Sequence, residues 1–182
     1  MFKCEAYNMF SIIKSTIQKC ISAIAYNMIA LFLIICFVDT NVAAQEVKII
    51  HFEDLQKMSH PHDDTTYIIN FFASWCVPCV KEMPILLDFE KSHSNQKIKL
   101  IFVSIDFKSN YKETLLPLLQ KLNIKKNIFL LQESNESKWI QMIDAKWSGD
   151  LPATLIVNAK KKQCNFYHQS IDTSILEKQF NQ

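Results

Sequence analysis

Blocks of apolar and polar positions predict a sheet of buried strands joined by amphipathic helices. Two apolar runs are typical of strands covered on both faces: Thr66–Ser74, which has no charged residue, and Lys97–Asp106, which is free of charge from Leu100 to Ile105. After the first run, apolar residues recur every three or four positions, with Val80, Met83 and Leu87 on one side. That spacing predicts a helix directly after a buried strand.

The remaining pattern extends this alternation to the end of the chain. Further strands are predicted at Val47–Phe52, Asn127–Gln132, Ala153–Asn158 and Gln163–His168, and helices at Glu53–Met58, Tyr111–Ile124, Ser137–Ala145 and Asp172–Asn181. The last two strands form a hairpin across Lys160–Lys162, and Asp172 or Ser174 caps the final helix. This order predicts an α/β domain whose central mixed β-sheet has helices on both faces.

The N-terminal segment has a different character. Three lysines precede the apolar run Met28–Val38, and the small residues of "VAAQ" follow it. This order predicts an export signal at residues 1–44, cleaved after Ala44. Two alternatives stay open: residues 21–38 remain as a membrane anchor, or the segment is a buried helix of a cytosolic protein.

Composition narrows the function further. With 182 residues and 49% apolar content, the chain can build one core, which we place at residues 45–182. The formal net charge of +2 is spread along the chain without a dense basic block. Nothing in this pattern favours binding to nucleic acid.

Cysteine usage points to chemistry rather than to structural cross-links. Export removes half of the six cysteines with the targeting segment and leaves Cys76, Cys79 and Cys164. A disulfide-stapled scaffold would carry a larger, even set. Cys164 is expected to be a small buried apolar residue, with redox or intermolecular bonding as its alternative.

Cys76 and Cys79 lie where the buried strand passes into the helix. A thiolate in the first turn of a helix faces unpaired backbone N–H groups and the positive end of the macrodipole, which favours its charged form. Cys76 is therefore the expected nucleophile. Cys79, three residues on, lies deeper on the same face and is suited to resolve a mixed disulfide. Thiol–disulfide exchange of this kind requires no metal or organic cofactor.

Other kinds of site also fit part of the pattern. A zinc site could combine Cys76 and Cys79 with Cys164 and a histidine, but the chain has no second closely spaced pair. The loop His60–Asp64 could bind a metal weakly, although a solvated loop explains it as well. A redox-inert partner-binding domain would need neither cysteine, and a peroxidase of the peroxiredoxin type would lack the second cysteine three residues later.

The stretch Phe71–Pro84, "FFASWCVPCVKEMP", resembles the active-site segment of thioredoxin-like proteins. It is most similar to the TlpA/ResA group of exported thiol–disulfide oxidoreductases, through the strand, the Trp-Cys-x-Pro-Cys core and the proline at Pro84. The family also has a cis-proline that faces the disulfide before a strand, and Pro152 in "DLPATLIVN" matches it. The resemblance covers residues 45–182.

This resemblance implies a thioredoxin-like fold with an extra strand–helix element between the cysteine helix and Pro152. It also implies that the Leu151 main chain pairs with an extended substrate segment. Trp75 is expected to pack beside the disulfide, with core packing as its ordinary role. Asn70 stands where cytosolic thioredoxins keep a buried aspartate that moves a proton for the inner cysteine.

A substitute proton carrier has two candidates, Asp106 and Glu82, although an exposed, solvated carboxylate is the ordinary expectation for each.

The two residues between the cysteines suggest the direction of electron flow. Val77 offers no side-chain donor and Pro78 lacks a backbone N–H. The helix terminus is therefore the only feature expected to stabilise the Cys76 thiolate. We therefore predict a reducing protein.

The expected function is thus an extracytoplasmic, periplasmic-type protein disulfide reductase. The resemblance implies disulfide-containing protein substrates, for example the cysteines of apocytochromes awaiting haem, or a part in redox homeostasis. A membrane-side donor would supply its electrons. The alternative is a redox-inert or metal-binding domain of the same fold.

Overall fold

The computed structural model describes residues 24, 26–28, 47–133 and 136–180, with the side chains of residues 136–138 left aside. Contacts along the chain separate residues 1–44 from residues 45–182. Nearly all of the expected signal or anchor, including most of residues 21–38, lies outside the described residues. Within the described part of the chain, no helix has both the length and the apolar character needed to cross a membrane.

The unit at residues 45–182 alternates strands and helices. In chain order its described elements are β1 (Lys48–Ile50), α2 (Phe52–Ser59), β2 (Thr66–Phe72), α3 (Val77–Ser92), β3 (Ile98–Ser104), α4 (Tyr111–Lys121), β4 (Ile128–Leu131), α5 (Glu136–Ile143), β5 (Ala153–Asn158), β6 (Gln163–Tyr167) and α6 (Thr173–Phe180). Each strand and helix predicted from the sequence is present, with ends that differ by a few residues.

The described strands form one mixed sheet in the order β1-β4-β3-β2-β5-β6. The first four in this order run parallel, whereas β5 is antiparallel to β2 and β6 is antiparallel to β5. In chain order, β4 and α5 fall between α3 and Pro152, and β4 inserts between β1 and β3. The mixed sheet and the expected extra strand–helix element are therefore confirmed.

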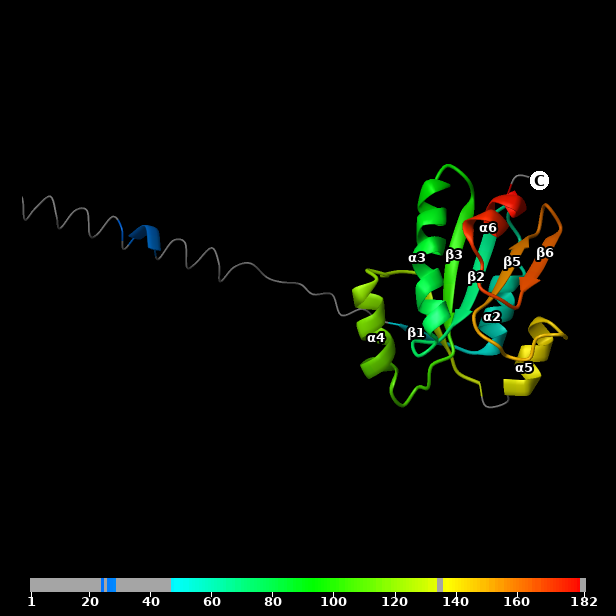
Figure 1. The fold of residues 1–182 in the computed structure, drawn as a ribbon, viewed down its shortest axis with the longest axis horizontal. Helices are drawn as coiled ribbons and strands as arrows, with labels where there is room; N and C mark the ends of the chain where they lie inside the picture. The colour runs from blue at the N-terminus through cyan, green and yellow to red at the C-terminus, as the bar shows by residue number, and fades with distance from the viewer. Residues whose placement is uncertain (1–23, 25, 29–46, 134–135, 181–182) are drawn as a thin grey trace, which may run out of the picture. The chain divides into compact units, whose positions relative to one another are not determined.

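Helices cover both faces of the sheet, as Figure 1 shows. On one face, α3, α4 and α6 pack over alternate residues of β2 and β3, such as Ile68 and Leu100. On the other face, α2 and α5 pack over the residues between them, such as Ile69 and Ile101. Because successive strand residues point to opposite faces, these fully buried strands supply two apolar cores.

Two element ends differ from the prediction for local reasons. The first strand was expected to reach Phe52, but β1 stops at Ile50 and Phe52 begins α2. The Phe52 side chain is buried, and its backbone N–H donates to Glu133 Oε1 at 2.7 Å. At the C-terminus, Asp172 rather than Ser174 caps α6, because Asp172 Oδ1 accepts from the backbone N–H of Ile175 at 3.0 Å.

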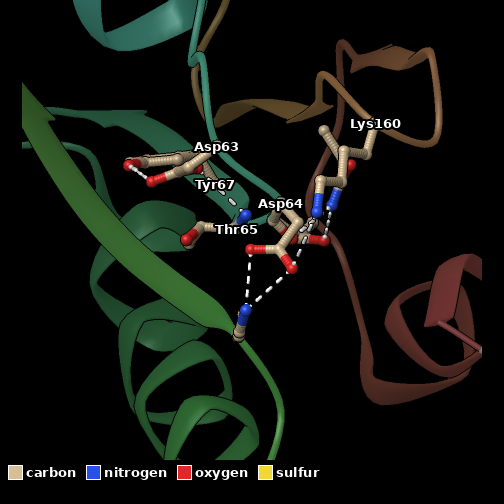
Figure 2. Close-up of polar contacts among 8 residues, drawn as sticks. Asp63, Asp64, Thr65, Tyr67 and Lys160 are labelled. Carbon is tan, nitrogen blue, oxygen red and sulfur yellow. Dashed lines mark hydrogen bonds and ion pairs between the residues drawn. The ribbon is translucent and has the colours of Figure 1, made fainter.

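An acidic pair lies at the start of β2 (Figure 2). Asp64 accepts two hydrogen bonds from Lys97 Nζ, at 2.7 and 2.9 Å, and one from Lys160 Nζ at 3.4 Å. Asp63 accepts from the backbone N–H of Thr65 at 3.0 Å and from the Tyr67 hydroxyl at 3.2 Å. The Asp64 bonds tie the start of β2 to the start of β3 and to the β5–β6 turn.

The Asp64 contacts predict a pH-dependent contribution to stability. The Lys97 hydrogen bond is the main cause that holds the pKa of Asp64 below its usual 3.8. A lowered pKa in the folded state stabilises the protein above pH 3.8, and this contribution is lost as the pH falls through the folded-state pKa. We expect Asp64→Asn to lower the urea midpoint at pH 7, and expect the difference from wild type to vanish in acid.

The matched control is Asp88→Asn, which changes an exposed aspartate on α3. Its urea midpoint should follow that of wild type at both pH values. High salt should shrink the Asp64→Asn effect, since exposed ion pairs are screened. A difference that survives both acid and 1 M salt would contradict the ion-pair explanation.

Candidate active site

The two cysteines lie at the junction of β2 and α3. The chain turns after Phe72, the backbone N–H of Cys76 donates to Ala73 O at 3.1 Å, and Cys76 is the N-cap of α3. Pro78 occupies a first-turn position, where its missing N–H removes no helical bond. The expected placement of Cys76 at the leading end of a helix is confirmed.

Cys76 and Cys79 are joined in a disulfide, with 5.3 Å between their Cα atoms. The backbone N–H of Cys79 also donates to Cys76 Sγ at 3.3 Å. Cys76 is 5% exposed and Cys79 is fully buried. Cys76 is therefore the more accessible residue of the pair.

The surface beside the disulfide is apolar. Trp75 and Val77 are each 63% exposed, so Trp75 does not have its alternative role in the core, and its packing beside the disulfide stays a prediction. Pro152 directly precedes β5, whose first residue pairs with Phe71 near the end of β2. The Leu151–Pro152 peptide bond is cis, as the resemblance implied, with Leu151 half-buried.

Asp106 is buried, contrary to the expectation of a solvated carboxylate. Its carboxylate accepts from the Ser74 backbone N–H at 2.9 Å, the Ser74 hydroxyl at 2.5 Å and the Ser104 hydroxyl at 2.7 Å. These bonds anchor the turn that leads to the cysteines. The hydrogen bonds of the Asp106 carboxylate thus fix the backbone of the turn that precedes Trp75.

Glu82 is also buried, and the expectation that it is exposed is wrong. One oxygen accepts from Asn70 Nδ2 at 2.7 Å. The other accepts from the Ser170 hydroxyl at 2.6 Å and from the Ile171 backbone N–H at 2.7 Å. Burial raises the pKa of Glu82 above its usual 4.5, and the three hydrogen bonds oppose that rise in part. Glu82 follows Cys79 by three residues on α3, so this buried carboxylate lies one helical turn from the inner cysteine on the same side of the helix.

Asn70 completes this buried cluster from the centre of β2. Its Nδ2 donates to Thr154 Oγ1 at 2.9 Å as well as to Glu82. Its Oδ1 is buried and has no hydrogen-bond partner among the described residues. The amide therefore joins β2, α3 and β5 below the disulfide.

Sequence reasoning missed three polar residues of the site, namely Ser74, Thr154 and Ser170. Thr154 carried a usable signal, since it is a hydroxyl in the apolar run "ATLIVN". Ser170 carried none, because it lies 88 positions from the carboxylate that it binds.

Cys164 lies apart from this cluster on β6. It is a free, exposed cysteine, so the expectation that it is buried is wrong. In the part of the chain that the structure describes, no three His, Cys, Asp or Glu side chains gather in a way that could hold a metal ion.

The chain belongs to the thioredoxin-like family, whose match spans residues 63–164. It is 36% identical over 59 residues to a curated relative, the sporulation thiol-disulfide oxidoreductase A of Bacillus subtilis (strain 168). That alignment covers 32% of this chain and 34% of the relative, so it spans about a third of the relative's length. Within this thioredoxin-like domain, the Cys-x-x-Cys pair lies at disulfide distance.

Solved structures support the fold. A thioredoxin-related protein from Neisseria meningitidis serogroup B is 20% identical with a TM-score of 0.53, over 64% of this chain and 82% of that one. A DsbF homologue from Corynebacterium diphtheriae is 14% identical with a TM-score of 0.52, over 66% of this chain and 73% of that one. Both confirm the thioredoxin-like architecture predicted from the motif.

Proposed function

We propose that the protein is a thiol–disulfide oxidoreductase that reduces disulfides of other proteins outside the cytoplasm. One observation carries this proposal: Cys76 caps α3, is bonded to Cys79 one turn deeper, and is the more accessible of the two cysteines. A purely structural disulfide gains little by closing so short a loop at a helix terminus. A disulfide that must open and close benefits from a position at a helix terminus, because the terminus stabilises the thiolate formed on reduction.

The reaction is two successive exchanges. The Cys76 thiolate attacks a substrate disulfide, forms a mixed disulfide and releases one substrate thiolate. Cys79 then loses its proton and attacks Cys76 Sγ, which releases the second substrate thiolate and closes the Cys76–Cys79 bond. Two electrons pass from the dithiol to the substrate, and the released thiolates take up protons.

Glu82 is our candidate acceptor for the Cys79 proton. Burial raises the pKa of this carboxyl toward that of a thiol, which makes proton transfer between the two groups less uphill. Asp106, the other candidate, binds Ser74 in the turn before Trp75 and Ser104 on β3, whereas Glu82 lies one helical turn from Cys79 on α3.

The substrate is expected to bind across the surface around Cys76. Trp75 and Val77 offer exposed apolar contacts, and the main chain of Leu151 can pair with an extended segment. Because Cys76 itself is 95% covered, a suitable disulfide must sit on a protruding or unfolded segment of its protein.

The reducing direction follows from what surrounds Cys76 Sγ. Strong oxidants of this fold stabilise the reduced thiolate, and the span from thioredoxin to DsbA is about 150 mV, or roughly 7 kcal/mol. Neither Val77 nor Pro78 adds a donor to the helix terminus. We therefore infer a reductant that draws electrons from a membrane-side donor, in keeping with the export signal or anchor predicted from residues 1–44.

The test uses the full chain. Titratable thiols should rise by two after dithiothreitol treatment, the reduced protein should reduce a protein disulfide, and its equilibrium with glutathione should give a potential near that of thioredoxin. An unchanged thiol count without substrate reduction would favour the redox-inert domain. Stoichiometric zinc on the reduced protein would favour the metal-binding alternative, and a potential near that of DsbA would reverse the direction.

A further inference from the structure

Asn70 Oδ1 is a buried acceptor without a hydrogen-bond partner among the described residues. Such atoms are rare in native proteins, because losing the bond to water without a replacement is costly. The orientation of the amide is not arbitrary. An ionised Glu82 can only accept, so the NH₂ group must face it, and Oδ1 must point elsewhere.

Cys79 lies on the same side of the sheet as the Asn70 amide. It belongs to the same core cluster as Ile68 and Phe72, which flank Asn70 on the same face of β2. It also precedes Glu82, the partner of Asn70 Nδ2, by three residues on α3. These two relations place the Cys79 side chain and the Asn70 amide at the same interface, between β2 and α3.

The redox state decides whether Oδ1 can find a partner. In the disulfide, Cys79 Sγ carries no hydrogen and cannot donate. Reduction places a thiol there that is buried from water, and a thiol is a weak donor that needs an acceptor. The one buried acceptor left open in the described cluster is Asn70 Oδ1.

We propose that Asn70 is a positioning residue for the resolving cysteine: in the reduced protein, its Oδ1 accepts the hydrogen bond of the Cys79 thiol, while its Nδ2 keeps its bonds to Glu82 and Thr154. This proposal deepens the proposed function and rests on it. Asn70 itself neither gains nor loses a proton. It orients the thiol beside the carboxylate and stabilises the protonated form of Cys79 until Cys76 has engaged the substrate.

The titratable groups packed around this pair are few. Glu82 and Cys76 lie one helical turn to either side of Cys79, and Tyr111 of α4 and Tyr167 of β6 pack against the core cluster that contains Cys79. The side chain of β5 that hydrogen-bonds Asn70 is Thr154, whose hydroxyl does not titrate. A change in the titration of Cys79 can therefore be traced to Asn70 or to one of these groups.

The experiment follows the pH dependence of Cys79 alkylation by iodoacetamide in the full-length Cys76→Ser protein, with Cys79 resolved by peptide mass spectrometry. Asn70→Leu removes the acceptor at similar volume, so the thiolate fraction at a pH below the midpoint should rise about fivefold, as expected for the loss of one hydrogen bond. Asn70→Asp keeps an acceptor and adds negative charge, so the midpoint should move the other way. Midpoints moving in the same direction, or not at all, would overturn the proposal, because a purely structural role affects both variants alike.

Thr154→Val is the matched control. It removes the other partner of Nδ2 and leaves Oδ1 untouched, so the Cys79 midpoint should stay within about twofold in thiolate fraction. If the Asn70 variants fail to fold, the side-chain amide resonances of Asn70 in the wild-type full chain provide a second measurement. They should shift between the oxidised and reduced forms, and unchanged resonances would overturn the proposal.

The alkylation midpoints of Cys79 can be measured whether or not the protein reduces a substrate. Alkylation needs no substrate, so an inactive protein with the expected midpoint shifts would count against the proposed reductase alone. An active reductase without those shifts would count against the role of Asn70 alone.

Discussion

Cys76→Ser should lower the rate of protein-disulfide reduction by about three orders of magnitude or more. The serine hydroxyl is a far weaker nucleophile than a thiolate at neutral pH, and removing the nucleophile of a concerted site costs on that scale. The helix terminus that stabilises a thiolate cannot ionise a hydroxyl to a useful extent. The measurement is the initial rate of reduction of a protein disulfide by the full chain, with dithiothreitol as electron source.

Two other cysteine variants separate the roles within the pair. Cys79→Ser retains the nucleophile but cannot resolve the mixed disulfide, so it should accumulate one covalently bound substrate per chain on a non-reducing gel. Cys164→Ser changes the exposed cysteine on β6 and should keep the wild-type rate. Full activity in Cys76→Ser, or trapping by Cys76→Ser in place of Cys79→Ser, would reverse our assignment of nucleophile and resolving residue.

Glu82→Leu should lower the free energy of unfolding by about 3 kcal/mol, even though leucine suits a core position. The substitution removes the acceptor for Asn70 Nδ2, for the Ile171 backbone N–H and for the Ser170 hydroxyl. Each buried donor left unpaired costs about 1–3 kcal/mol, whereas Ser170 is exposed and can turn to water. Urea unfolding of the oxidised protein at constant pH measures this difference.

The pH dependence of that difference has a defined sign. The pKa of Glu82 is raised by burial, so the folded state binds the proton more tightly than the unfolded chain does. Wild-type stability from this group is therefore greatest below pH 4.5 and falls as the pH rises through the folded-state pKa. The gap between wild type and Glu82→Leu should narrow over the same interval, since leucine does not titrate.

Asp88→Leu on the same helix is the control for introducing leucine. Asp88 is exposed, so its replacement should change the free energy of unfolding by no more than about 0.5 kcal/mol. A cost for Glu82→Leu equal to that of Asp88→Leu would contradict the role of the carboxylate as an anchor. A gap that widens with rising pH would contradict the direction of its pKa.

Sequence patterns predicted the structure correctly where a feature depends on residues close together in the chain. Strand β2 and helix α3 follow from an apolar run and a helical repeat, and the placement of Cys76 at the junction follows from these two elements. The extra β4–α5 element was predicted from the length of chain between Cys79 and Pro152. These features depend on pattern and spacing, which the sequence states directly.

The predictions from sequence were wrong for the burial of individual residues. Glu82 and Asp106 look like ordinary surface carboxylates, and Cys164 looks like a core residue, yet the structure reverses all three. A helical or strand position shows which face a residue occupies, but whether another element covers that face depends on segments far away in the chain. The exposure of Trp75 has the same origin, since no described element covers the surface beside the disulfide.

The sequence by itself determined the class of fold and the reactive pair, because the strand and helix repeats and the Cys-x-x-Cys spacing are local patterns. Only the tertiary structure decided which carboxylate lies beneath the inner cysteine. Asn70 and Ser170 reach Glu82 from two separate segments, and Thr154 binds Asn70 from a third, only when the sheet and its helices pack. A hydrogen-bond network across such distances has no local pattern, because its members share a place in space and not an interval in the chain.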